Sequence, residues 1–258
     1  CRLSTHPMCY GESIVIRLLD QKKRVLGLKD LGLPLSQQEL LSQMGHLPEG
    51  MIIFTGPTGS GKSTSLYALL KQLPAQAKNI VTLEDPIEYE LSGIRQSQID
   101  EPLGFTFEEG IRSLLRQDPD VILIGEIRDA PTAKMALRAA LTGHLVLTTL
   151  HTNDVFGVIQ RFEDLGISPH ALCGVIKCVV SQRLVRLLCN HCKEKQAHQW
   201  IPGQCHHCHY TGYKGRSPIA ECLPWGPYLD DVIHGGCKPG DFMAQALSHG
   251  FSPIQSQA

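Results

Sequence analysis

The sequence predicts an α/β protein built on a parallel sheet, and the first observation behind this is the alternation of two kinds of segment. Short, continuous apolar runs such as residues 51–54 are followed by segments with apolar residues at helical spacing, such as 66–73. Runs of the first kind are typical of strands that are buried on both faces of a sheet. The second observation is the sequence Gly-Pro-Thr-Gly-Ser-Gly-Lys-Ser at 56–63, the pattern of a phosphate-binding loop between a strand and a helix.

The loop at 56–63 predicts a site for a nucleoside triphosphate. Its three glycines let the backbone wrap closely around a phosphate, which the backbone N–H groups and the helix dipole would hold. Lys62 is expected to reach the β- and γ-phosphates, and the Ser63 hydroxyl to ligate Mg²⁺. The alternative is a chance glycine-rich turn, which the flanking strand and helix disfavour. The predicted nucleotide-binding residues are Gly56, Pro57, Thr58, Gly59, Ser60, Gly61, Lys62, Ser63 and Thr64.

Two more predicted strands end in acidic residues. The apolar run 80–83 leads into an acidic segment that contains Glu88, and the run 121–124 leads into Glu126. In open α/β sheets the ligand lies beyond the carboxyl ends of the strands. Mg²⁺ needs oxygen ligands, and triphosphate hydrolysis needs a base that orients water. Glu88 and Glu126 are therefore the candidate catalytic carboxylates; alternatively, either is a strand-end carboxylate that pairs with an arginine or caps a helix.

Helices and one more strand are predicted for the residues that follow. Residues 131–142 are alanine-rich and helical, and residues 145–148 form a fourth apolar strand. A helix carrying Arg161 comes next, and a further helix is expected from 169 to about 187.

Two histidines, His144 and His151, flank the strand at 145–148. A histidine near the γ-phosphate could sense the nucleotide state through a hydrogen bond. The residues alone favour the other reading, a histidine satisfied by backbone carbonyls.

Composition sets limits on the class of protein. With 258 residues, 42% hydrophobic residues and a net charge of -1, the chain can form one main α/β core and a smaller appendage. No apolar run approaches the roughly 20 residues that span a bilayer, and the first residues lack the basic-then-apolar layout of a signal peptide. A cytoplasmic protein is expected. Dispersed charges of both signs argue against a nucleic-acid partner.

The chain opens in what reads as the middle of a domain. It begins with Cys1, and the β-like run from Ser13 to Leu18 follows no start signal, so we expect a fragment. Residues 21–48 have the composition of a linker with a short lead-in helix near 37–44.

Four cysteines form two CxxC pairs separated by 12 residues. Paired CxxC knuckles are typical of tetrahedral Zn²⁺, and four thiolates would close the coordination sphere, which makes the role structural. Disulfides are the alternative, which a reducing cytosol disfavours. Several histidines crowd the same segment, so one of them could replace a cysteine. The predicted zinc ligands are Cys189, Cys192, Cys205 and Cys208.

Taken together, these motifs resemble the secretion ATPases of the type II secretion and type IV pilus assembly family. The resemblance runs from Arg2 to about Glu221. It rests on the loop at 56–64, an acidic box at 83–88, a Walker B region at 118–129, and a histidine box from Thr142 to Asp154. The cysteine element, closed by Gly-Tyr-Lys-Gly-Arg at 212–216, corresponds to the family's zinc ribbon. The ribbon favours the extension or secretion branch, since the related retraction ATPases lack it.

The resemblance implies a RecA-like P-loop domain with a zinc-ribbon insertion, preceded by a remnant of a PAS-like domain. It implies that His144 and His151 face the nucleotide, that Glu88 orients water, and that Glu126 acts around Mg²⁺. Counterparts of Arg2 and Arg17 approach the nucleotide as charge-stabilising arginines in the family. Such arginines contribute strongly to phosphoryl transfer.

The family further implies an ATP-hydrolysing hexameric ring that drives pilin or pseudopilin assembly. The ring would lie in the cytoplasm, peripheral to the inner membrane through platform and adaptor proteins. Two other functions stay open: a nucleotide-binding scaffold without turnover, and a nucleic-acid translocase on the same fold. The expected domains are 1–20 (PAS-like tail), 21–48 (linker and helix), 49–188 (ATPase core), 189–216 (zinc element) and 217–258 (C-terminal helical segment).

This chain departs from the family pattern in three places. The preceding domain is represented only by its tail, which puts ring assembly and full activity in doubt. The gap between the CxxC pairs is short, which makes the ribbon compact, and Ser217-Pro218 stands where Thr-Gly is usual.

Overall fold

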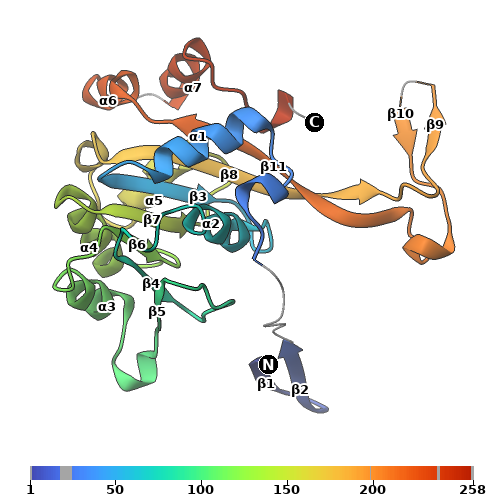
Figure 1. Cartoon of the computed structure of the whole chain (residues 1–258), viewed down its shortest axis with the longest axis horizontal. Coiled ribbons are helices and arrows are strands. Elements are labelled where there is room, and N and C mark those ends of the chain that lie inside the picture. The colour runs from blue at the N-terminus through green and yellow to red at the C-terminus, as the bar shows by residue number, and fades with distance from the viewer. Residues whose placement is uncertain (1, 18–24, 198, 237–238, 257–258) are drawn as a thin grey trace.

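A computed structural model describes residues 2–17, 25–197, 199–236 and 239–256 of the chain. Its centre is a seven-stranded sheet with the strand order β11-β8-β3-β7-β6-β4-β5 (Figure 1). Six of these strands are parallel, and only β11 runs antiparallel to its neighbour β8. The strands are β3 Gly50–Thr55, β4 Ile80–Glu84, β5 Arg95–Gln98, β6 Val121–Ile124, β7 Leu145–Leu150, β8 Ile176–Leu188 and β11 Tyr213–Pro224.

The four apolar runs of the sequence form the middle of this sheet. Every residue of β3, β4, β6 and β7 is buried, as expected for strands covered on both faces. The α/β fold class with a parallel sheet is therefore confirmed. Because the strands are parallel, their carboxyl ends share one edge, where a ligand can meet loops from several strands.

Two helical layers cover the sheet. One face packs against α1 Leu35–Gly45 and α2 Lys62–Leu70 together with the short turn η1 Leu28–Asp30. The other face packs against five helices (Figure 1). These are α3 Phe107–Leu114, α4 Ala130–Leu141, α5 Gly157–Asp164, α6 Pro227–His234 and α7 Pro239–Ser248. The lead-in helix near 37–44 and the helix at 131–142 correspond to α1 and α4.

The helix expected from 169 to about 187 is wrong. Only a short 3-10 turn, η3 Pro169–Leu172, is helical there, and β8 occupies residues Ile176–Leu188. Apolar residues in this segment recur at a spacing that also fits a helix, but β8 hydrogen-bonds to β3 on one side and β11 on the other. Tertiary pairing thus overrides the local pattern.

The strand β5 and the helix α3 were not predicted from the sequence, and β11 extends further along the chain than predicted. The polar edge strand β5 and the helix α3 lie between the predicted strands at 80–83 and 121–124. The expectation of a helical segment at 217–258 holds only from α6 onward, together with η5 Ile254–Ser256. Residues 217–224 instead complete β11, because they pair with β8.

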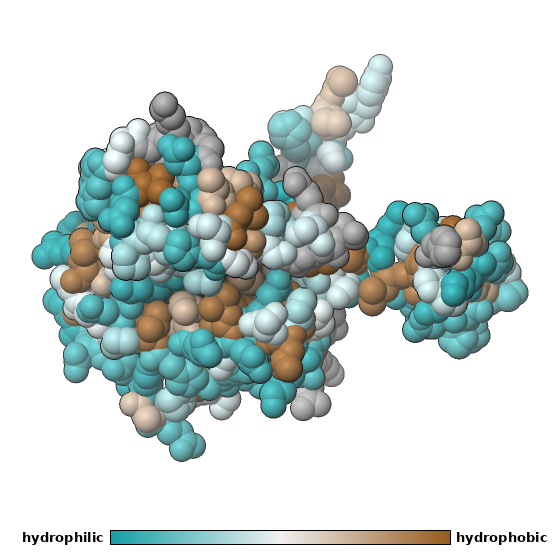
Figure 2. All heavy atoms as spheres, turned by 90° about the horizontal axis from the view of Figure 1, so that it is seen from above, coloured by the Kyte–Doolittle hydropathy of each residue, from teal (hydrophilic) through white to brown (hydrophobic). Residues whose placement is uncertain are grey.

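Strands β8 and β11 continue beyond the sheet as a two-stranded arm (Figure 1). At its end lie the antiparallel pair β9 Glu194–Gln196 and β10 Gln199–Ile201 and the turn η4 His206–Cys208. Seen from above, this end is a mainly hydrophilic knob joined to the body by a narrow neck (Figure 2). The four cysteines of the two CxxC pairs lie in this knob.

The chain opens with an antiparallel hairpin, β1 Arg2–Met8 and β2 Gly11–Arg17. Its second strand matches the β-like run that the sequence indicates. Another short turn, η2 Glu101–Leu103, precedes α3. Among the described residues, no helix combines the length and apolarity needed to cross a bilayer.

Candidate nucleotide-binding site and cysteine cluster

The loop at 56–61 connects the buried strand β3 to the first turn of α2, at the carboxyl edge of the sheet. Gly56, Gly59 and Gly61 all have positive φ, at 135°, 78° and 89°. A Cβ on Gly56 would lie 2.4 Å from the Gln182 carbonyl oxygen. No side chain fits there, because real Cβ atoms do not approach a backbone oxygen so closely.

The side chain of Gln182 in β8 hydrogen-bonds to this loop, a contact that the sequence does not predict. The side chain is 1% exposed, and its Nε2 donates to the Ser60 carbonyl oxygen at 2.7 Å. Its Oε1 accepts a hydrogen bond from the Ser65 hydroxyl at 2.8 Å. One buried amide thereby fixes both the loop and the start of α2. Buried hydrogen bonds of this kind restrict a backbone to one conformation.

Lys62 lies in the loop and is largely buried. Its Nζ donates to the carbonyl oxygens of Gly56 and Pro57 at 2.8 and 3.1 Å. Burial lowers the pKa of Lys62, as does the nearby positive charge of Arg183, whereas Glu126 raises it. The Arg183 guanidinium is anchored by a 2.7 Å hydrogen bond to the Asn153 carbonyl oxygen. Two cations therefore lie close to the phosphate loop, an arrangement that suits a polyanion.

A cavity of about 330 Å³ opens beside the loop. Residues from the loop, from the carboxyl ends of β4, β6 and β7, and from α2 line it, which brings together parts of the chain far apart in sequence. The predicted site residues among its lining are Thr58, Gly59, Lys62, Ser63, Glu88, Glu126 and His151.

The two candidate carboxylates share this cavity. Glu126 follows β6 and is one-fifth exposed, with its Oε1 2.5 Å from Nη2 of Arg128. Arg128 also lies 3.6 Å from Asp85, so it bridges the ends of β4 and β6, and the pairing with Glu126 raises its pKa. Glu88 lies in the loop after β4 and is exposed to the cavity. Glu126 therefore pairs with an arginine, as the alternative interpretation of a strand-end carboxylate predicts. This ion pair lies at the cavity that holds the predicted site residues.

His151 lines the cavity next to Glu126. His151 follows β7 and its Nε2 lies 3.7 Å from Oε2 of Glu126. Burial lowers the pKa of His151, as does the charge of Lys62, while Glu126 acts in the opposite direction. The lowered pKa of His151 favours the neutral imidazole, which can donate from one ring nitrogen and accept at the other.

His144 is not among the residues that line this cavity within one chain, and its expected approach to the nucleotide stays a prediction. It precedes β7, and its carbonyl oxygen accepts the N–H of Gly50 at the start of β3. The six residues of β7 separate it from His151, a distance of roughly 20 Å along a strand. Its Nδ1 lies 3.0 Å from the Ala139 carbonyl oxygen, the backbone contact that the residues alone favoured.

Arg2 and Arg17 face each other as a backbone pair in the β1–β2 hairpin. The side chains of both lie outside the described residues, as do residues 18–24, which join the hairpin to the rest of the chain. Their expected approach to the nucleotide is therefore untested.

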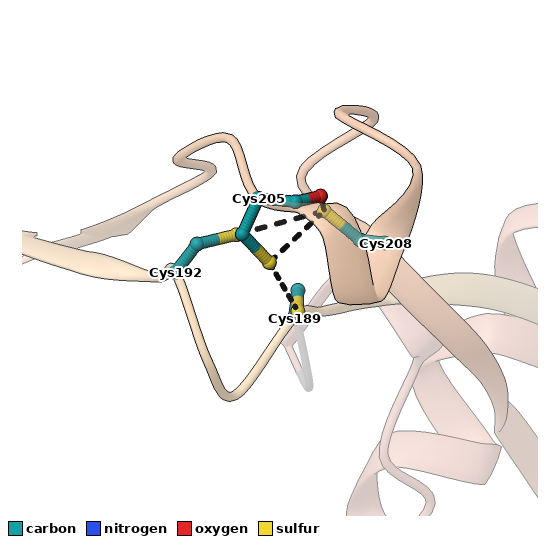
Figure 3. A group of neighbouring side chains, drawn as sticks. All are labelled: Cys189, Cys192, Cys205 and Cys208. Atoms are coloured by element: carbon teal, nitrogen blue, oxygen red, sulfur yellow. Dashed lines mark hydrogen bonds between the residues drawn. The ribbon is translucent and has the colours of Figure 1, made fainter.

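The four predicted cysteines converge at the end of the arm (Figure 3). All four sulfur atoms lie within 4.8 Å of one another, and three of the pairs are separated by 3.7 Å. Four thiolates at 2.3 Å from a tetrahedral Zn²⁺ would be about 3.8 Å apart, whereas a disulfide would need about 2 Å. The cysteines are free, and their spacing fits a closed Zn²⁺ site. No histidine belongs to the group among the described residues.

A parallel sheet with a phosphate loop at its carboxyl edge, and acidic residues at the ends of the neighbouring strands, defines a RecA-like P-loop protein. The chain belongs to the family of type II/IV secretion system proteins, whose model matches residues 1–255. It is 48% identical over 253 residues to the type II secretion system protein E of Klebsiella pneumoniae, covering 91% of this chain and 50% of that relative. The chain spans about half the length of the curated relatives it matches.

Solved structures agree with this assignment. The pilus retraction motor PilT with bound ADP superimposes with a TM-score of 0.69 at 28% identity, covering 98% of this chain and 71% of that chain. The ATPase DotB of Legionella pneumophila gives a TM-score of 0.70 at 24% identity, covering 98% and 65%, which is a likeness of fold alone.

Proposed function

We propose that this chain is the ATP-hydrolysing part of a motor that drives pseudopilin or pilin assembly in type II secretion or type IV pilus biogenesis. The observation that carries the proposal is the single cavity in which Lys62 and Ser63 of the phosphate loop face Glu88 and Glu126. A cation and a hydroxyl suited to a Mg²⁺-bound triphosphate thus lie opposite carboxylates that can serve the attacking water.

The proposed roles follow from the environments of these residues. Glu126 is partly buried between Arg128 and His151, a polar setting that suits a carboxylate acting around Mg²⁺. Glu88 is exposed to the cavity and is proposed to orient the attacking water. Lys62 would exchange the carbonyl oxygens of Gly56 and Pro57 for phosphate oxygens. When bound, Mg²⁺ would neutralise charge on the phosphates, with Ser63 as a ligand.

Charge-stabilising roles for Arg2 and Arg17 stay part of the proposal, as does the division into five domains, with the C-terminal helical segment beginning at α6. The cysteine group is proposed to bind one structural Zn²⁺, because four sulfurs leave no coordination position open for water. The working form is proposed to be a hexameric ring in the cytoplasm that reaches the inner membrane through platform and adaptor proteins.

Lys62→Ala tests the proposed activity. We expect Mg²⁺-dependent ATP hydrolysis in the unaltered chain and a fall to background in the variant, because the loop loses the cation that faces the phosphates. Lys177→Ala is a matched control, since its Nζ donates to the Gly174 carbonyl oxygen and Lys177 is not among the residues that line the cavity. Equal turnover in the unaltered chain and Lys62→Ala would refute the proposed site. ATP binding without turnover would favour a scaffold, and salt-dependent DNA binding would favour a translocase.

A further inference from the structure

Tyr67, in the middle of α2, connects the phosphate-loop helix to the acidic segment after β4. The side chain is 2% exposed, so its hydroxyl needs partners inside the protein. That hydroxyl donates to Oε2 of Glu84 and accepts the backbone N–H of Glu88 at 3.3 Å. One oxygen atom therefore joins α2, the end of β4 and the residue proposed to orient water.

Glu84 is the fixed point of this arrangement. It is 5% exposed, and its Oε1 accepts hydrogen bonds from the Thr82 hydroxyl at 2.5 Å and from Nε2 of Gln96 at 3.1 Å. With Tyr67 this makes three donors on one buried carboxylate. Among the described residues, Oε2 takes its hydrogen bond from Tyr67, so losing that hydroxyl leaves a buried carboxylate oxygen without this donor.

Gln96 extends the same network to the far end of the acidic segment. Its Oε1 accepts the N–H of Leu91 at 2.6 Å, and its Nε2 also donates to the Tyr89 carbonyl oxygen at 3.0 Å. The backbone around residues 88–91 is thus tied at Glu88 by Tyr67 and at Tyr89 and Leu91 by Gln96. The backbone is therefore held at Glu88 itself and at residues that directly follow it.

We propose that Tyr67 is a positioning residue for Glu88, and that its hydroxyl keeps this carboxylate at a set place relative to the phosphate loop. The inference rests on the proposed function, since it assigns Glu88 to the attacking water. A phenylalanine would fill the same space, so packing alone does not require the hydroxyl. Orientation errors of about 1 Å at a reacting group are costly in rate.

Tyr67→Phe tests the inference through two separate readouts. Turnover of ATP is expected to fall about tenfold, and ATP affinity to stay within about twofold, because the hydroxyl bonds Glu84 and Glu88, which lie after α2 in the chain and outside the phosphate loop. Amide hydrogen exchange across residues 85–91 is expected to speed up by about tenfold. Tyr228→Phe is the control, because it removes a phenol hydroxyl from another part of the protein. That hydroxyl donates to the Pro224 carbonyl oxygen at 2.7 Å, and Tyr228 does not line the cavity.

Unchanged exchange across residues 85–91 would overturn the inference whatever the turnover. Faster exchange with full turnover would overturn it as well, because the segment would then not need the hydroxyl for the reaction. If even the unaltered chain does not hydrolyse ATP, the proposed function fails separately, and exchange alone decides whether Tyr67 holds the segment. Gln96→Leu gives a second test should Tyr67→Phe not fold, with the same expected loss of turnover and faster exchange at Leu91.

Discussion

Gly56 and Gly59 lie three residues apart in the phosphate loop but tolerate a side chain very differently. A Cβ at Gly59 would meet nothing within 4 Å, whereas at Gly56 it would collide with the Gln182 backbone. We expect Gly59→Ala to lower the free energy of unfolding by roughly 1 kcal/mol, the cost of a positive φ, and Gly56→Ala to lower it by roughly 3 kcal/mol. Urea denaturation of both variants measures the difference, and equal losses would contradict the close packing of β8 beneath the loop.

His151 gives a pH-dependent prediction of known sign. Its pKa is lowered in the folded protein, mainly by burial, so below the unfolded value of about 6.5 the unfolded chain takes up the proton more readily. The stability from neutral His151 is therefore present above that pH and is lost as the pH falls through it. Unfolding measured at pH 7 and pH 5 should show a smaller drop for His151→Gln than for the unaltered chain. An identical drop would mean that partial burial and the charge of Lys62 do not lower the pKa of His151.

At this scale the sequence predicts residues whose chemistry a motif defines. Lys62, Glu88 and Glu126 meet at one cavity because the phosphate loop and the strand ends share an edge of the sheet. Gln182 could not be predicted, since its contact with Ser65 spans 117 residues and depends on which strand neighbours β3. His144 and His151 lie at opposite ends of β7, so within one chain the motif alone does not bring both histidines to one pocket.

At the scale of elements, continuous apolar runs predict strands well and mixed runs predict them poorly. The apolar runs that form β4 and β6 are buried throughout, so apolar side chains are favoured on both faces of the sheet. Strand β8 is buried only in its first half and exposed along the arm, and this change of environment removes the alternation that identifies a strand. Pairing with β11, a strand far along the chain, decides its conformation.

The arm itself yields a prediction about the metal. Strands β9 and β10 have three residues each, too few to be stable without a further link. We expect about one zinc per chain, lost in Cys189→Ser and in Cys205→Ser but retained in the control Cys173→Ser, which lies outside the group. Because the knob is joined by a narrow neck, the unfolding midpoint of the body should change little (Figure 2). Metal analysis of reduced protein checks this, and a metal-free unaltered chain would refute the zinc site.

At the scale of the whole molecule, the arginines expected to complete the cavity lie on the hairpin formed by β1 and β2. Within the described residues, the cations near the phosphate loop are Lys62, Arg128 and Arg183. Phosphoryl transfer commonly needs one more cation, supplied by another part of the assembly. A neighbouring copy of the chain can supply this cation only when the copies associate.

Turnover per chain should therefore rise with protein concentration, since a site completed between copies depends on association by mass action. We expect at least a several-fold increase over a hundredfold range of concentration, levelling off once copies are fully associated, with Lys62→Ala at background throughout. Sedimentation at the same concentrations should place the increase where larger assemblies form. Turnover that is constant per chain while assemblies form would mean that one chain carries a complete site. Arg2→Ala and Arg17→Ala should each lower the associated plateau, because both arginines are proposed to stabilise charge at the nucleotide.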